Sequence, residues 1–363
     1  MRPINKIDMS GDELSKEQVI EVRKVLGRYI KDATTKSRHK KCMLCDKPGG
    51  FCNSHTIPRF CLENIAWNGK LNSFNTLMGS ELLSKDSGLN NAATFHIICK
   101  PCDNSVFQDY EKAEVYDTAP SETALNQIVL KNSLRDIYKH EMEIELFEAS
   151  KQMMKEKQPL LSFLIAPMVD AQIKARMRDI EECYEIFRKA KGYLSDRESW
   201  LRVVSYDKLD YTVPIAFQGM VALVTGMNGE VINDNFNHKR NYKIEYLHLA
   251  VFPLKGSTAV MLFLDSENKR YAMFEKHITE TTLEKRLEII NRIIVLYAED
   301  YFLSKKLDEE TLKNLEGTAQ TLQDMLTANP TKSLRNAVKD YDLRRDICIP
   351  NLFLKGYAVT FDD

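Results

Sequence analysis

The 363-residue chain is 44% hydrophobic, and its 51 Lys and Arg residues against 52 Asp and Glu give a formal net charge of −1. This length allows two or three domains with ordinary cores, and the balanced charge gives no overall attraction to nucleic acid or to an anionic membrane. The chain has no apolar run of about 18 residues and no apolar signal-peptide core near its start, so we expect a cytoplasmic protein with no membrane partner.

The first expected element is a helix over residues 13–33, where apolar residues recur close to helical spacing. A short basic cluster, KSRHKK at residues 36–41, follows it and stands directly before Cys42. Such a cluster can lie along a phosphate backbone, or it can be a solvated loop.

Four of the eight cysteines form two CxxC pairs, and 53 residues separate Cys45 from Cys99. A CxxC turn directs two thiolates toward one point, and zinc takes four tetrahedral ligands. Cys42, Cys45, Cys99 and Cys102 therefore predict a structural zinc site rather than a disulfide framework. An alternative local set consists of Cys42, Cys45, Cys52 and His55, and it leaves the second pair without a metal.

The middle of the chain predicts one polar insertion and two long helices. Trp67 to Thr94 is rich in Asn, Ser, Gly and Lys, which suggests an insertion between the two halves of the metal site. A helix is expected from Ser121 to Lys157 and another from about Pro167 to Leu194, paired antiparallel across the QPLLSF connector. The HEMEIE segment from His140 is read as a solvated face of the first of these helices.

After Asp196 the pattern changes to β-branched and aromatic runs separated by turn signals such as Asn228-Gly229. These runs predict an antiparallel sheet of four or five strands, followed by helices over Leu283–Leu307 and Glu309–Leu326, with Tyr297–Tyr301 on the polar side of the first. The expected fold class is α+β. The expected domains are residues 1–118 with the metal site, 119–195 with the helical hairpin, and 196–363 with the sheet flanked by helices.

The two cysteine-rich stretches, CMLCDKPGGFCNSHTIPRF and FHIICKPCDNSVFQDYE, resemble the zinc-containing HNH endonucleases of the ββα-metal or treble-clef type. The resemblance covers roughly residues 38–115 and lies in the order of a CxxC knuckle, an SHTIP strand, a second knuckle and a helix. It implies a zinc-stapled HNH-like module in which His55 is the general base and Asp103 is a ligand of a catalytic Mg²⁺ or Mn²⁺ ion.

The chain departs from the family pattern at two positions. Ser54 stands where the family usually has an Asp or His, and Thr94 stands where it commonly has an Asn, with His96 nearby. The resemblance then implies a metal shell rebuilt from Asp103, Asn104 and Glu111. On a helix beginning near Cys102, Asp103, Phe107 and Glu111 would share one face.

The function expected from this resemblance is metal-dependent hydrolysis of nucleic-acid phosphodiesters, with DNA the favoured partner and bacterial phage defence the expected setting. The alternative is a non-catalytic zinc module that binds nucleic acid, a protein partner or a second copy of the chain. A third hypothesis makes the C-terminal sheet a ligand sensor with the zinc module as its lid. Nothing in residues 196–363 identifies a ligand.

Overall fold

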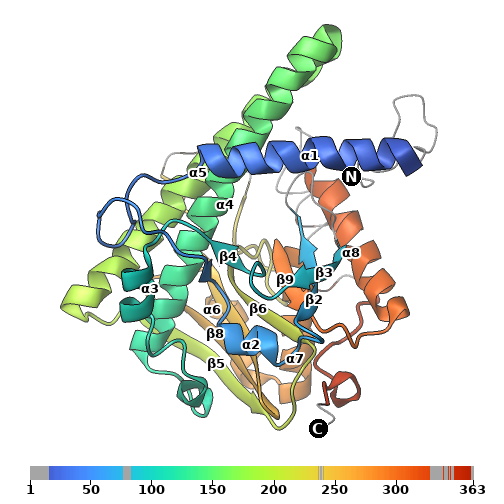
Figure 1. Ribbon diagram of the computed structural model, residues 1–363. Coiled ribbons are helices and arrows are strands. Elements are labelled where there is room, and N and C mark those ends of the chain that lie inside the picture. Colours follow the sequence, from blue (N-terminus) through green and yellow to red (C-terminus); the bar gives the residue numbers. More distant parts are fainter. Residues whose placement is uncertain are drawn as a thin grey trace.

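A seven-stranded sheet organises the chain in the computed structural model, which describes residues 16–76, 83–235, 237, 239, 241–327, 338, 342, 344 and 347–360 (Figure 1). The strand order is β3-β2-β9-β6-β7-β8-β5, and each neighbouring pair is antiparallel. The strands are β2 (Lys70–Asn75), β3 (Leu83–Gly88), β5 (Leu201–Leu209), β6 (Ile215–Val221), β7 (Leu247–Leu254), β8 (Ser257–Asp265) and β9 (Asp300–Leu303). The prediction of a mixed fold with an antiparallel sheet is confirmed.

Both faces of the sheet are covered, so its central strands are apolar on both sides. On β7, Leu249 and Val251 belong to one buried cluster, whereas Ala250 and Phe252 belong to another, as the period of two in a strand requires. The first cluster includes side chains of α6 (Ala272–Glu280), α7 (Leu283–Tyr297) and α8 (Glu309–Thr327). The second includes side chains of α4 (Glu122–Lys157) and of the N-terminal cysteine-rich region.

Helices α4 and α5 (Pro159–Asp196) form the expected hairpin, which projects beyond the rest of the molecule (Figure 1). Ser121 caps α4 by accepting a hydrogen bond from the Ala124 N–H at 3.3 Å. We expected QPLLSF to connect the two helices and the second helix to begin near Pro167. This prediction is wrong, because α5 begins at Pro159 and Pro167 lies inside α5. Proline at the first helical position lacks only an N–H that would have no partner there. The hairpin tip exposes Leu160 and Phe163 by 86% and 82%.

Two segments that we expected outside the sheet are strands. The insertion contributes β2 and β3, and residues 300–303, expected in a helix, form β9 between β2 and β6. Helix α7 ends at Tyr297 because the chain then pairs with strands from both parts of the sequence. The sheet thus contains strands from both sides of the expected boundary at residue 118, and it has seven strands rather than four or five.

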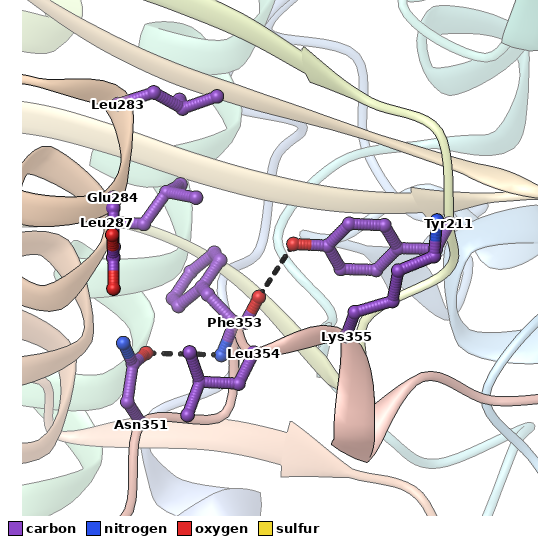
Figure 2. A pocket seen from close by; sticks show the side chains of 8 residues that line it. All are labelled: Tyr211, Leu283, Glu284, Leu287, Asn351, Phe353, Leu354 and Lys355. Carbon is purple, nitrogen blue, oxygen red and sulfur yellow. Dashed lines mark hydrogen bonds between the residues drawn. The ribbon is translucent and has the colours of Figure 1, made fainter.

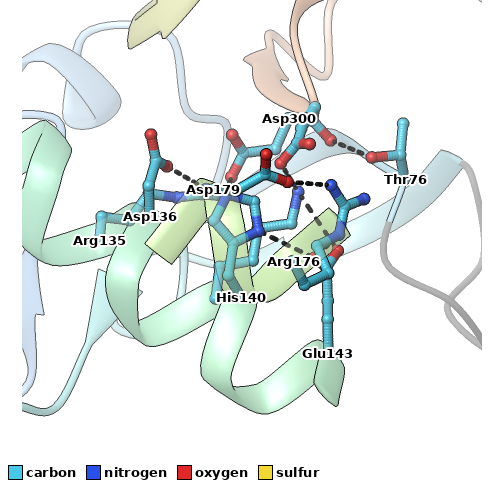
Figure 3. Close-up of polar contacts among 10 residues, drawn as sticks. Thr76, Arg135, Asp136, His140, Glu143, Arg176, Asp179 and Asp300 are labelled. Atoms are coloured by element: carbon cyan, nitrogen blue, oxygen red, sulfur yellow. Dashed lines mark hydrogen bonds and ion pairs between the residues drawn. The ribbon is translucent and has the colours of Figure 1, made fainter. Parts of the chain in front are cut away.

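Buried charged side chains join the hairpin to the chain just before and within β9 (Figure 3). Glu143 is only 5% exposed and forms an ion pair with Arg176 Nε at 2.7 Å. Its carboxylate also lies 3.0 Å from His140 Nδ1 and 3.9 Å from Lys139 Nζ. Lys139 also pairs with Glu299, and Arg135 pairs with Asp300. His140 is therefore part of a buried network, and the expected solvated face of this helix is wrong at His140 and Glu143.

The helix α1 (Lys16–Lys36) packs on α4 through Tyr29, Ile30 and Ala33, which meet Met142 and Leu146. None of the helices among the described residues is apolar over enough length to cross a membrane.

Candidate metal centre

The four cysteines of the two CxxC pairs come together in the structure. The sulfur atoms of Cys42, Cys45, Cys99 and Cys102 all lie within 4.8 Å of one another, and those of Cys45 and Cys99 are 3.7 Å apart. Four ligands at ~2.3 Å from a tetrahedral zinc ion would lie about 3.8 Å from each other. All four cysteines are free of disulfides. The group is close enough to bind one metal ion, and its sulfur donors and spacing fit zinc.

Backbone hydrogen bonds hold the first knuckle against the second. The Cys42 N–H donates to the Lys47 carbonyl at 2.9 Å, and the Asp46 N–H donates to the Cys42 carbonyl at 2.9 Å, which closes the turn. Asp46, Gly49 and Gly50 have φ values of 58°, 68° and 68°, a left-handed backbone that glycine adopts most easily. The Lys100 N–H donates to the Gly50 carbonyl at 3.1 Å, so the turn is tied to the start of the helix Lys100–Val106.

The second knuckle lies at the start of α3 (Lys100–Val106), where Cys99 is the N-cap residue. The Cys99 N–H points at the Cys42 sulfur at 3.3 Å. Burial opposes ionisation of Cys42, but the N–H groups of Cys45, Cys99 and Leu44 lower its pKa to about 7. These amides favour a thiolate, which is the form that binds a metal.

The alternative ligand set is not brought together. The Cys52 sulfur contacts the Ile98 carbonyl at 3.6 Å, and burial raises its pKa to about 12, which favours the neutral thiol. His55 Nε2 lies 3.1 Å from the Leu89 carbonyl. Among the described residues, the group placed to bind a metal is the pair of CxxC knuckles.

A two-stranded sheet and α3 adjoin the two knuckles. The two-residue strands β1 (Ser54–His55) and β4 (Thr94–Phe95) pair antiparallel, and Asp103 lies in the first turn of α3. His55 is half-buried, and its Nε2–H donates to the Leu89 carbonyl, which leaves Nδ1 as the acceptor. Burial lowers the pKa of His55, and Lys131 and Arg59 add to this, so the imidazole is neutral at pH 7.

Asp103 and Ser54 hold a buried ammonium group. The Ser54 hydroxyl donates to Asp103 Oδ1 at 2.7 Å, and Lys131 Nζ donates to the same oxygen at 2.7 Å and to Ser54 Oγ at 2.8 Å. Lys131 extends from α4 and is 0% exposed. Its charge also lies 4.2 Å from the centre of the Phe107 ring, a cation–π distance.

Glu111 also contacts the Lys131 ammonium group, although it does not lie on the helix of Asp103 as we expected. Helix α3 ends at Val106, so Asp103, Phe107 and Glu111 do not share a helix face, yet all three contact Lys131, with Glu111 Oε1 3.8 Å from Nζ. Burial raises the pKa of Glu111, and Asp103 adds to this while Lys131 lowers it. One ammonium group thus contacts two carboxyl groups.

These residues do not fit a catalytic Mg²⁺ or Mn²⁺ ion. The Lys131 ammonium group already lies 2.7 Å from Asp103 Oδ1 and 3.8 Å from Glu111 Oε1, where such an ion would bind. Asn104 is exposed on α3, and no hydrogen bond joins it to His55 or Asp103, both of which the structure describes. His96 lies against Tyr138, with the ring centres 6.0 Å apart.

Lys131 was absent from the candidates that the sequence suggested. A signal was available, because Lys131 lies three residues from both Ile128 and Leu134 in a run of α4 that is entirely buried from Ala124 to Leu134. A lysine at helical spacing within an apolar stripe needs a buried carboxylate partner.

Exposed basic side chains surround the knuckles and continue onto α1. Lys41 precedes the first ligand, Lys47 closes its turn, and Lys100 follows Cys99. On α1, Lys24, Arg28 and Lys31 follow one helix face, opposite the buried Ala33. The exposed set, which we call the basic track, comprises Lys24, Arg28, Lys31, Lys36, Arg38, Lys40, Lys41, Lys47 and Lys100.

A separate pocket lies in the C-terminal part of the chain, between α7 and residues 351–355 (Figure 2). Its volume is about 170 Å³, and Leu287, Phe353 and Tyr211 line it. The Tyr211 hydroxyl donates to the Phe353 carbonyl at 2.7 Å. Sites for drug-sized ligands have volumes of about 300 Å³ or more, so this pocket gives little support to the sensor hypothesis.

No family model, curated protein or solved structure matched this chain.

Proposed function

We propose that residues 38–115 form an HNH-like module, held by one structural zinc ion, that binds nucleic acid, with DNA the favoured partner. The observation that carries this proposal is the basic track. It places exposed lysine and arginine side chains next to the cysteine knuckles and along α1, in a chain with almost no net charge.

The charge of the chain is strongly uneven. Residues 23–47 contain nine Lys and Arg against two Asp, a charge of +7, which leaves −8 for the remainder of a chain whose total is −1. Among the described residues, no acidic side chain forms an ion pair with Lys40, Lys41, Lys47 or Lys100. Such a surface attracts the phosphate backbone of a nucleic acid, and contacts between lysine and phosphate require no particular base sequence.

Neutralising part of the basic track tests the proposal. We expect the triple variant Lys40→Ala/Lys41→Ala/Lys47→Ala to bind DNA at least tenfold more weakly, because three phosphate contacts are lost. The slope of log Kd against log salt should fall by about one for each lysine that contacts a phosphate. Fluorescence anisotropy with a short labelled duplex, repeated at several salt concentrations, measures both quantities.

The matched control is Lys255→Ala/Lys276→Ala/Lys313→Ala, which removes three exposed lysines far along the sequence from the metal centre. This control should bind as the unmodified protein does. Equal affinities of the two triple variants would rule out the basic track as the binding surface. A parallel series with RNA duplexes and single strands decides which nucleic acid binds more tightly.

Cleavage by the same module is a second candidate, and the geometry of His55 favours it. The Leu89 carbonyl fixes the tautomer of His55, and its lowered pKa keeps the ring neutral, as a general base requires. The position of Lys131 weighs against cleavage, because its ammonium group is paired with Asp103, an acidic residue that a catalytic cation would need.

A plasmid-nicking assay separates the two candidates. If the module cleaves, His55→Ala should reduce nicking at least a hundredfold, in line with the loss of a general base, while DNA affinity and melting temperature change little. The assay is run with Mg²⁺, with Mn²⁺ and with EDTA. Binding without nicking in every condition, or equal nicking by His55→Ala, would leave the binding module as the function.

A further inference from the structure

We propose that the ammonium group of Lys131 takes the place of the divalent cation that the resemblance to HNH endonucleases implies. Ser54, Asp103 and Glu111 then hold a fixed side-chain cation, and the module needs no Mg²⁺ or Mn²⁺ at this position. The inference rests on side-chain geometry and does not depend on nucleic-acid binding.

The contacts of Lys131 are those of a bound cation. Its ammonium group lies 2.7 Å from Asp103 Oδ1, 2.8 Å from Ser54 Oγ and 3.8 Å from Glu111 Oε1, so three oxygen atoms from separate segments surround one positive charge. Carboxylate and hydroxyl oxygens are also ligands of Mg²⁺ and Mn²⁺. Ser54 and Asp103 occupy the strand and helix positions at which the resemblance implies metal ligands.

Aromatic rings enclose the ammonium group of Lys131. Lys131 is 0% exposed, and the rings of Phe107, Tyr110 and Phe95 lie 4.2, 5.7 and 5.8 Å from its nitrogen. Aromatic faces attract a positive charge and exclude water from it.

Removing the ammonium group should convert the position into a divalent-cation site. The variant Lys131→Met keeps the length of the side chain and leaves Asp103 and Glu111 without a cation. We expect Mn²⁺ to raise its melting temperature by about 5 °C at concentrations about a hundredfold above Kd, and to leave that of the unmodified protein unchanged. Differential scanning fluorimetry measures the shift, and electron paramagnetic resonance counts bound Mn²⁺.

Two further variants keep the test decisive. Lys189→Met removes a partly buried lysine that pairs with Asp265 and Glu267, and its melting temperature should not respond to Mn²⁺. Lys131→Met/Asp103→Asn removes the ammonium group and the nearer of its two carboxylates, so it should fold even if Lys131→Met does not, and it should show no Mn²⁺ response.

Three results would overturn the inference. The first is Mn²⁺ binding by the unmodified protein that Asp103→Asn abolishes, because the position would then hold a divalent ion beside Lys131. The second is folded Lys131→Met that does not respond to Mn²⁺. The third is a double variant that is no more stable than Lys131→Met in the absence of Mn²⁺. DNA affinity is a separate readout, so each of the two proposals can fail without the other.

Discussion

Replacing Cys42 or Cys102 by serine is expected to reduce bound zinc from about one ion per chain to almost none. Each substitution breaks a shell of four sulfur atoms that lie within 4.8 Å of one another. Structural zinc contributes roughly 10–16 kcal/mol to small zinc-dependent folds, more than the packing of the short strands β1 and β4 can replace. Elemental analysis of protein purified under reducing conditions measures the loss.

The unfolding should be local to the metal module at first. Hydrogen exchange in Cys42→Ser is expected to lose protection around residues 41–52 and in α3, while the central strands β7 and β8 keep theirs. A variant that retains one zinc ion and full protection would exclude these cysteines as ligands.

Cysteines outside the shell provide the controls. Cys52→Ser and Cys61→Ser should retain the metal, because neither sulfur belongs to the group of four. Cys183→Ser is a matched control for burial alone, since Cys183 is 2% exposed and lies in α5. Loss of zinc in Cys52→Ser would instead favour the alternative ligand set with His55.

The second large effect concerns Glu143 at the joint between the hairpin and β9 (Figure 3). Glu143→Gln should lower the free energy of unfolding by about 3–5 kcal/mol, because it removes the carboxylate that three cationic groups share. Glu141→Gln is the matched control on the same helix. Its partner is His39 at 2.7 Å, both side chains are partly exposed, and the expected loss is about 1 kcal/mol or less.

The effect of Glu143→Gln should depend on pH in a predictable direction. Burial raises the pKa of Glu143, but Arg176, Lys139 and His140 lower it below its usual value of 4.5, so its stabilisation is present above about pH 4.5 and is lost on acidification. Burial opposes protonation of His140, but Glu143 and Glu299 raise its pKa above 6.5, so its stabilisation is present below pH 6.5 and is lost as the pH rises.

The difference between the unmodified protein and Glu143→Gln should therefore be greatest between about pH 4.5 and 6.5. Urea unfolding at a series of pH values measures it. A difference that is constant from pH 4 to 8 would show that the ionisation of these groups contributes little.

The grouping of the four cysteines could be predicted from the sequence because the geometry of a CxxC turn is local. Its two sulfur atoms converge whatever surrounds them, and only the pairing of the two turns needs the fold. The helix from Ser121 to Lys157 was predictable for a similar reason, since its cap and a long stretch without Gly or Pro both lie within the segment.

The strands β2 and β9 and the role of Lys131 depended on distant partners. Asn72 in β2 is buried and polar, and its side-chain amide donates to the Ser304 carbonyl at 3.1 Å, 232 residues away. Residues 300–303 continue an apolar helical pattern, and only pairing with β2 and β6 makes them a strand. Between the helices that carry Asp103 and Lys131, the chain passes through a 3-10 helix (Ala113–Tyr116) and turns whose course the sequence does not specify.

The position of β9 between β2 and β6 has a consequence for synthesis of the chain. The ribosome releases the N-terminal region first, and the four cysteines can close around a metal once Cys102 has emerged. More than 200 residues separate the end of β2 at Asn75 from Asp300, so β2 has no β9 partner until Asp300–Leu303 have been synthesised. Until then β2 and β6 each present an unpaired edge, which can pair with other chains. A translation product that ends before Asp300 would keep both edges open permanently, and we expect it to aggregate even with its metal site intact.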